Sequence, residues 1–205
     1  MITQQETSHA GDRALAASRR RWLVLLAVGV STFMSALDGS IVSTILPVIT
    51  GSLHATVAAT EWVITTYLLV ISGLLLGFGR LGDIRGHRTV YLAGFLVFVG
   101  GSALCAMSSS IAWLVASRAL QAVGAACLMA TAPAIITANF PARQRGQALG
   151  LQGTMTYLGL TTGPALGGWL AHTLGWRSVF TVNIPIGLLA MAMGVKFIPR
   201  SRPSV

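Results

Sequence analysis

Two charged residues lie deep inside long apolar stretches of the 205-residue chain: Asp38 in MSALDGSIVSTILP and Arg118 in LVASRALQAVGAA. A charge in hydrocarbon costs at least about 2.5 kcal/mol on insertion scales, so such residues usually face an internal cavity or a charged partner. One interpretation is a structural ion pair or a position near the membrane interface. The other is functional, with a carboxylate that binds protons and an arginine that tunes this binding or holds an anionic group. Both interpretations stand on the sequence alone.

No pattern for catalysis, metal binding or a cofactor accompanies these two charges. The four histidines form no ligand cluster, and Cys105 and Cys127 lie in apolar runs without the paired spacing of a metal site or a disulfide framework. Residues 77–82 match the dinucleotide pattern GxGxxG, but they end an apolar run instead of following a strand, so we reject that interpretation. No GxSxG, HExxH or phosphate-loop motif is present. We therefore expect no enzyme, no metal and no cofactor.

The composition indicates an integral membrane protein. The chain is 54% hydrophobic and 9% charged, against about 25% charged residues in soluble domains, and its mean hydropathy is +0.73. The net charge of +9 raises the possibility of nucleic-acid binding. The basic residues lie in short clusters between apolar runs, however, so we expect a membrane lipid environment and no nucleic acid.

Six apolar runs are each close to the length of about 20 residues that a spanning helix needs. They cover residues 22–49, 61–79, 89–107, 111–136, 146–171 and 176–198. Lys and Arg alternate across the connections, with twelve on one side and only Arg177 on the other. Under the positive-inside rule, both termini are cytoplasmic. The expected organisation is a tail over residues 1–20, a transmembrane bundle over 21–199 and a tail over 200–205. The first tail is expected to be disordered, and it lacks the pattern of a cleavable signal peptide.

The fold expected from these runs is all-α, with six transmembrane helices. The first three and last three runs match in length and in loop size, which is consistent with a three-plus-three inverted repeat. The connections are short, so no soluble domain is expected.

The fifth run contains a stretch, residues 150–168, whose glycines are spaced for helix packing. Gly159, Gly163 and Gly167 recur every fourth residue and form one stripe without side chains. Such a stripe lets a second helix backbone come close, which is how helices associate in lipid. Pro164 lies within the stripe, and a kink or bend is expected there.

Residues 79–88, GRLGDIRGHR, are expected to form a tight cytoplasmic turn with one acid among three arginines. Its glycines permit a sharp reversal. Asp83 can pair locally or lie at the N-terminus of a helix from a neighbouring bundle.

These features resemble the N-terminal half of a major facilitator superfamily transporter, in particular the drug:proton antiporters of the fourteen-helix type. The helix-five stretch is similar to the family's antiporter motif at every fixed position. These positions are Gly150, Gly159, Gly163, Pro164, Gly167 and Gly168. The loop is similar to the cytoplasmic gate motif and keeps Gly79, Asp83, Gly86 and Arg88. Ile84 stands where a basic residue is usual, and His87 stands where Arg is common.

Further segments resemble the same group. Residues 118–124, RALQAVG, are similar to the helix-four motif linked to proton coupling, with Ala122 in place of a usual glycine. Residues 37–47 resemble the helix-one motif of these exporters, and residues 61–68 and 176–187 resemble further marks of the fourteen-helix group. The resemblance covers essentially residues 21–198.

The resemblance implies alternating access, in which two bundles rock around a central cavity and inward proton flow drives hydrophobic, often cationic, compounds out of the cell. Asp38 and Arg118 are then the proton-coupling residues. The glycine stripe controls bundle packing, and Asp83 docks against the other half. The expected location is the plasma or inner membrane.

Family members carry a second bundle, whereas this sequence ends at Val205, after the sixth run. A single bundle cannot enclose a two-sided cavity. Three explanations stand: a part of a full transporter that needs its C-terminal bundle, a half-transporter that works as a homodimer, or a remnant without transport. The alternative function is a non-transporting, regulatory membrane protein that binds a full transporter.

Overall fold

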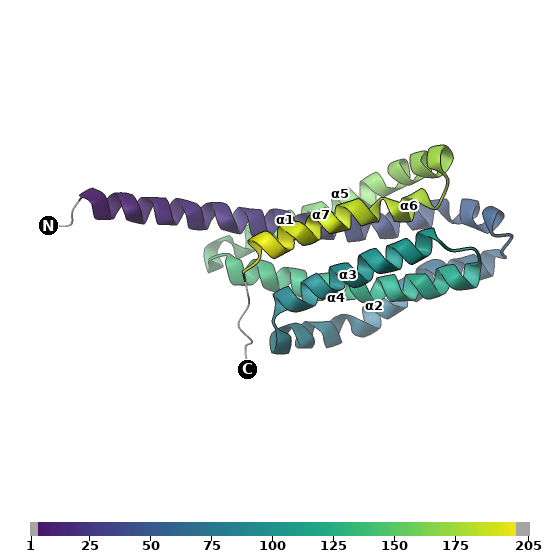
Figure 1. Ribbon diagram of the computed structural model, residues 1–205, viewed down its shortest axis with the longest axis horizontal. Coiled ribbons are helices and arrows are strands. Elements are labelled where there is room, and N and C mark those ends of the chain that lie inside the picture. The colour runs from purple at the N-terminus through teal and green to yellow at the C-terminus, as the bar shows by residue number, and fades with distance from the viewer. Residues whose placement is uncertain (1–3, 200–205) are drawn as a thin grey trace.

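The computed structural model describes residues 4–199, with side chains described from residue 18 onward. Within this part the chain is helical and contains no strand (Figure 1). Its helices are α1 (Gln4–Ser52), α2 (Val57–Arg85), α3 (His87–Ala106), α4 (Ile111–Asn139), α5 (Ala142–Leu174), α6 (Ser178–Thr181) and α7 (Asn183–Phe197).

Five described segments are long and apolar enough to cross a membrane, namely Ser18–Ser52, α2, α3, α4 and Ser178–Phe197, which joins α6 and α7. The remaining predicted span, the fifth along the chain, corresponds to α5. This helix has the length, at 33 residues, but its glycines, threonines and N-terminal arginines make it less apolar. The chain is a multi-pass membrane protein.

The N-terminal segment differs from the prediction of a disordered tail, because the backbone is helical from Gln4. Residues 14–21, ALAASRRR, consist mainly of strong helix formers, so helix α1 continues toward the N-terminus beyond the apolar span without a break. Residues 1–3 and the predicted tail over 200–205 lie outside the described residues.

Two helix boundaries also differ from the prediction. Helix α2 begins at Val57 and not at Glu61, because the Thr56 side chain accepts a hydrogen bond from the backbone N–H of Ala59 at 3.3 Å and caps the helix. The predicted turn over residues 79–88 shrinks to one residue, since α2 continues to Arg85 and α3 begins at His87. Gly86 makes this joint with φ = 90°, in the left-handed region that favours glycine.

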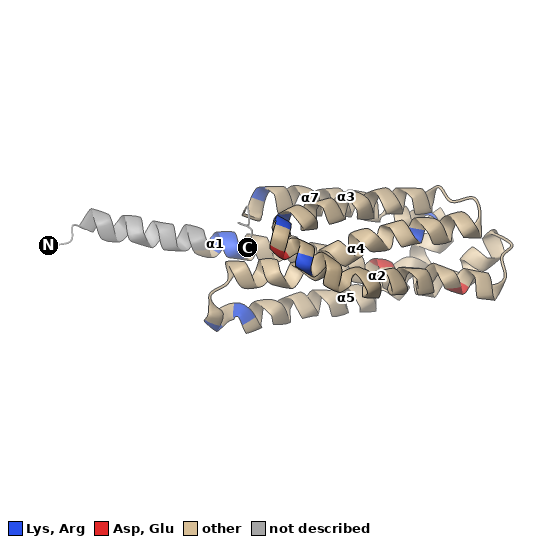
Figure 2. Cartoon of the chain, turned by 90° about the horizontal axis from the view of Figure 1, so that it is seen from below, with Lys and Arg blue, Asp and Glu red and all other residues tan. Residues whose placement is uncertain are grey.

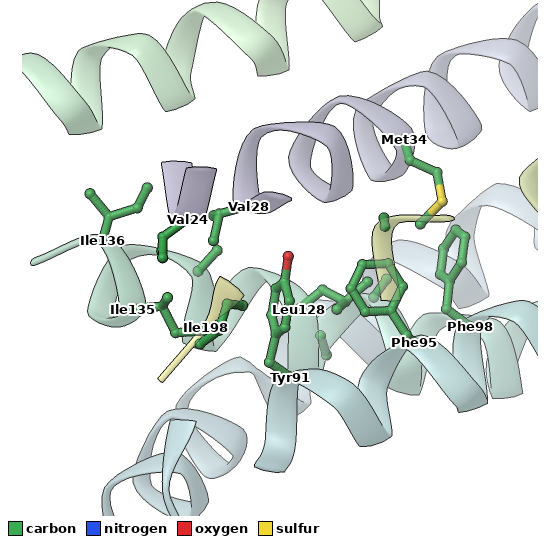
Figure 3. Packing of buried hydrophobic residues seen from close by; sticks show 14 of the residues in the cluster. Val24, Val28, Met34, Tyr91, Phe95, Phe98, Leu128, Ile135, Ile136 and Ile198 are labelled. Carbon is green, nitrogen blue, oxygen red and sulfur yellow. The ribbon is translucent and has the colours of Figure 1, made fainter. Parts of the chain in front are cut away.

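The buried apolar side chains form two clusters, one toward each end of the bundle. The first, termed the basic-end core, lies among the helix ends that carry the arginine clusters; Figure 3 shows part of it, including Val24, Tyr91 and Ile136. Its Tyr91 hydroxyl points toward α1 and lies 2.7 Å from Ser31 Oγ (Figure 3). The second, termed the far core, includes Ile49 and Leu114. Consecutive long helices therefore run in alternating directions through the bundle.

The charged residues are distributed unevenly along the bundle. In Figure 2 most of the blue segments, which mark Lys and Arg, lie at one end of the helix bundle, and only a few lie elsewhere. This end holds the α2–α3 and α4–α5 connections, as the alternation of charge in the sequence requires.

Candidate functional site

Asp38 on α1 and Arg118 on α4 form a direct ion pair inside the bundle. Arg118 Nη1 lies 2.6 Å from Asp38 Oδ2, and the two side chains are 1% and 0% exposed. A buried pair of this kind balances two large desolvation costs, so its hydrogen bonding must be nearly complete. The two charges therefore form the ion pair that the first interpretation named, and the same contact is compatible with the functional interpretation.

Uncharged polar residues complete this pairing. Asp38 Oδ1 accepts hydrogen bonds from Asn183 Nδ2 at 2.6 Å and from Gln121 Nε2 at 3.0 Å. Gln121 Oε1 accepts a second bond from Arg118 Nη1 at 2.7 Å, and its Nε2 also donates to Ser102 Oγ at 2.7 Å. Asp38, Ser102, Arg118, Gln121 and Asn183, all buried, are termed the polar network. It satisfies both carboxylate oxygens with protein donors.

Aromatic rings cover the guanidinium of Arg118. Its carbon Cζ lies 3.8 Å from the ring centroid of Tyr67 on α2 and 5.8 Å from that of Phe180 on α6. Desolvated cation–π contacts of this kind contribute about 2 kcal/mol. The charge of Arg118 is thus held between a carboxylate, an amide oxygen and a π face.

The polar network lies where the two apolar cores meet. On α1 the boundary falls between Met34 of the basic-end core and Leu37 of the far core, directly before Asp38. On α4 it falls between Ala122 and Leu114, which flank Arg118. The network therefore occupies the middle of the bundle, away from both ends.

A cavity of about 430 Å³ opens beside the network between α1, α2, α4 and α5. Tyr67 belongs to its wall, so this side chain contacts both the cavity and Arg118. The rest of the wall is mainly apolar and includes Ile71, Leu128, Met129 and Leu160. Such a shape and lining are typical of sites for small organic ligands.

The predicted glycine stripe packs α5 against α1. A Cβ atom at Gly159 would lie 2.6 Å from the carbonyl oxygen of Phe33, and one at Gly163 would lie 2.5 Å from Ser40 Cβ. At Gly167 the nearest atom would be Ile41 Cγ2, at 3.1 Å. At Gly159 and Gly163 only glycine permits this approach without a shift of the neighbouring atoms, whereas at Gly167 the contact is merely tight.

Pro164 explains a hydrogen bond across the same interface. Proline has no N–H, so the carbonyl of Leu160, four residues earlier, loses its helical partner. The Ser40 hydroxyl donates to this carbonyl at 2.8 Å. The glycine stripe brings Ser40 close enough to do so.

The other motif glycines of α5 behave differently. A Cβ atom at Gly150 or Gly168 would have no heavy atom within 4 Å. Close packing is therefore confined to the face of α5 that carries the glycine stripe, and Gly150 and Gly168 lie outside this interface.

The gate-motif residues lie around the α2–α3 joint. His87 Nε2 lies 3.3 Å from Asp83 Oδ1, across the α2–α3 joint. Arg88 Nη2 donates to the carbonyl of Val195 at 2.8 Å, near the C-terminal end of α7, where carbonyl groups lack helical partners. Gly79 has open space around its Cα. Asp83 thus has a contact within this bundle, and its docking to another half stays a prediction.

The sequence analysis included Tyr67, Gln121 and Asn183 only as members of motif segments and gave them no role of their own, and Ser102 belongs to none of these segments. Uncharged polar residues are common in membrane helices and carry little signal by themselves. A usable signal was present in the spacing, since Gln121 follows Arg118 by three residues and so shares its helix face.

Comparisons with known proteins identify the family. The model of the Major Facilitator Superfamily matches residues 28–205. A riboflavin transporter of Clostridioides difficile is 41% identical over 182 residues, which are 89% of this chain and 40% of the relative. A multidrug transporter of Bacillus subtilis is 36% identical over 172 residues (84% of this chain, 32% of the relative). A tetracenomycin C resistance and export protein of Streptomyces glaucescens is 36% identical over 183 residues (89% and 34%).

The chain thus spans 32–40% of the length of these three relatives. They are named as transport and export proteins, which agrees with the prediction that the chain is not an enzyme. With a family match over most of its length, the chain belongs to the major facilitator superfamily.

Proposed function

We propose that the chain forms a six-helix bundle, in which α5 is the fifth span, of a secondary transporter that exports hydrophobic small molecules in exchange for protons. The observation that carries this proposal is the buried Asp38–Arg118 pair beside a largely apolar cavity. A relative named as a resistance and export protein supports the direction of transport, and one named as a multidrug transporter supports the substrate class.

In this proposal, protonation of Asp38 changes the net charge that is buried inside the bundle. While Asp38 is ionised, its charge and that of Arg118 cancel. Protonation of Asp38 removes the counter-charge of the guanidinium, whose other close contacts, the amide of Gln121 and the ring of Tyr67, are uncharged. A buried charge without a counter-charge costs several kcal/mol. Protonation therefore favours a second conformation in which Arg118 is solvated or re-paired, which couples proton binding to alternation between states.

The orientation is proposed from the charge distribution. The end of the bundle that carries the arginine clusters faces the cytoplasm, so both termini are cytoplasmic in the plasma or inner membrane. The far core then lies in the outer half of the membrane.

A second bundle is proposed to face α2 and α5. Only 11% of the most apolar window of α2 is buried within the described chain, and Leu68, Leu69 and Leu76 are among its exposed side chains. We propose that this face is covered by lipid and by a second bundle, which is either the C-terminal part of a longer chain or a second copy of this one. The mass of the protein in lipid nanodiscs, measured by native mass spectrometry, distinguishes a single longer chain from a homodimer.

The decisive test is efflux by Asp38→Asn in liposomes that contain the full-length protein bearing this sequence. The expected result is loss of efflux driven by a pH gradient, with normal insertion into the membrane. Glu61→Gln is the matched control, because Glu61 is exposed and lies outside the polar network. Wild-type efflux by Asp38→Asn would refute the proposed coupling role.

A further inference from the structure

We propose that a groove between α1 and α5, at the basic end of the bundle, binds one anionic phospholipid of the adjoining leaflet. The groove lies between residues 22–30 of α1 and residues 151–155 of α5, and it is termed the α1–α5 groove. One acyl chain of the lipid lies in the groove, and the phosphate group lies between Arg19 and Arg145. This lipid site involves neither the polar network nor the exchange of protons.

The α1–α5 groove begins where the glycine stripe ends. Continued toward the basic end at every fourth residue, the stripe reaches Met155 and then Leu151, whose side chains hold the two helices apart. A Cβ atom at Gly29 would lie 3.3 Å from Met155 Cγ, so α1 and α5 still touch at this level through a side chain. Beyond this contact a groove of about 180 Å³ remains.

The lining of the groove suits an acyl chain. None of the lining residues is charged, and the amide of Gln152 donates to Thr32 Oγ1, which belongs to the wall of the central cavity. From Trp22 to Val30 the groove follows α1 for about 12 Å, which is most of the hydrocarbon depth of one leaflet, about 15 Å. A chain inside a groove makes more van der Waals contacts than one on a convex helix surface, and such packing drives association in lipid.

Two arginines lie at the mouth of the groove, one on each helix. Arg19 precedes Trp22 by three residues and Leu26 by seven, so the three side chains share one face of α1. Arg145 Nε donates to the carbonyl of Phe140 at 3.2 Å. The ring of Phe140 packs edge-on against Trp22, with 5.7 Å between the ring centroids. Trp22 is therefore next to both arginines, to one along its own helix and to the other through Phe140.

The charges of these two arginines are not neutralised by the described part of the chain. Both side chains are exposed, and neither forms an ion pair with a carboxylate whose position the structure describes. A phosphate group accepts paired hydrogen bonds from the planar guanidinium of arginine. Phosphatidylcholine carries an ammonium group beside its phosphate, and the arginines repel this group. The site therefore favours a phospholipid with a net negative charge.

The test measures which lipids the protein retains. The full-length protein bearing this sequence is reconstituted with equal amounts of phosphatidylglycerol and phosphatidylcholine that have the same acyl chains. Native mass spectrometry then counts the bound lipids of each kind. The wild-type protein is expected to retain phosphatidylglycerol in preference to phosphatidylcholine. Arg19→Gln and Arg145→Gln should each lower this preference about fivefold, the contribution of one arginine near an anionic lipid surface.

Arg80→Gln is the matched control for charge, because Arg80 is exposed at the same end of the bundle but belongs to α2 and does not line the groove. It removes the same charge and should leave the preference within about twofold of the wild-type value. An equal loss in Arg80→Gln would assign the preference to the general surface potential and would overturn the proposal. A wild-type protein without any preference would also overturn it.

The contribution of the acyl chain is tested by filling the groove. Leu26→Trp adds volume to the groove without a change of charge and should lower the retention of phosphatidylglycerol. Leu96→Trp is its control, because Leu96 is exposed on α3 and lies outside the groove. Circular dichroism verifies that each variant is folded. Equal retention by these two variants would refute the chain-binding groove, and so would a wild-type protein that retains no lipid because its second bundle covers the groove.

Discussion

Replacing single motif glycines of α5 by alanine should destabilise the protein at some positions and not at others, although all of them match the sequence motif. At Gly163 the new Cβ would lie 2.5 Å from both Cβ and Oγ of Ser40, so α1 and α5 must separate or Ser40 must move. Either response weakens the hydrogen bond from Ser40 to the Leu160 carbonyl, which has no helical partner because of Pro164.

The change in the free energy of unfolding is the sum of two unfavourable contributions and one favourable contribution. Overpacking a tight contact costs about 1–3 kcal/mol, and the lost hydrogen bond costs about 1 kcal/mol. The higher helix propensity of alanine returns up to about 1 kcal/mol. Gly163→Ala should therefore lower the free energy of unfolding by about 1–3 kcal/mol. Gly159→Ala should lower it at least as much, because the atom it meets at 2.6 Å is a backbone oxygen.

Gly168→Ala and Gly150→Ala are the matched controls, since neither Cβ would meet any atom within 4 Å. They should leave stability unchanged or raise it by up to about 1 kcal/mol. The assay is unfolding in mixed micelles with increasing SDS, followed by circular dichroism. If Gly163→Ala and Gly168→Ala unfold at the same SDS fraction, the proposed packing of α5 on α1 is refuted.

Three further substitutions test the interior of the bundle in the same unfolding assay. Arg118→Gln leaves the Asp38 carboxylate buried without its cation and should lower the free energy of unfolding by about 3–5 kcal/mol. The double variant Arg118→Gln/Asp38→Asn should regain part of this stability. No regain would contradict the pairing. Asn183→Ala removes the donor 2.6 Å from Asp38 Oδ1 and should cost about 1.5–3 kcal/mol, whereas a neutral effect would place Asn183 outside the network. Tyr91→Phe should cost only about 0.5–1.5 kcal/mol, because Ser31 keeps its bond to the Val28 carbonyl.

The sequence predicted the charged part of the site because charge is rare and costly in apolar segments. Asp38 and Arg118 stand out for this reason, whereas their contact depends on how α1 and α4 pack, which no local pattern encodes. Asn183 illustrates the same limit, since it lies 145 residues from Asp38 along the chain and still donates to it. Long-range partners of this kind require the assembled bundle.

The helices themselves followed from hydropathy, but their ends did not. Thr56 caps α2 upstream of the predicted start, because capping depends on a single side chain and hydropathy averages over many. The glycine stripe was predicted because its glycines recur at every fourth residue, and the structure places it against α1. Gly150 and Gly168 match the family motif equally well, yet they have no packing contact at Cβ, so motif membership alone did not predict their environment.

The most direct test of the account is the number of protons released when substrate binds to the purified full-length protein, measured with a pH-sensitive dye in weak buffer. We predict that the wild-type protein releases protons on binding a transported substrate, and that Asp38→Asn binds the substrate but releases none. Equal proton release by wild type and Asp38→Asn would show that another group carries the proton and would contradict the role proposed for the Asp38–Arg118 pair.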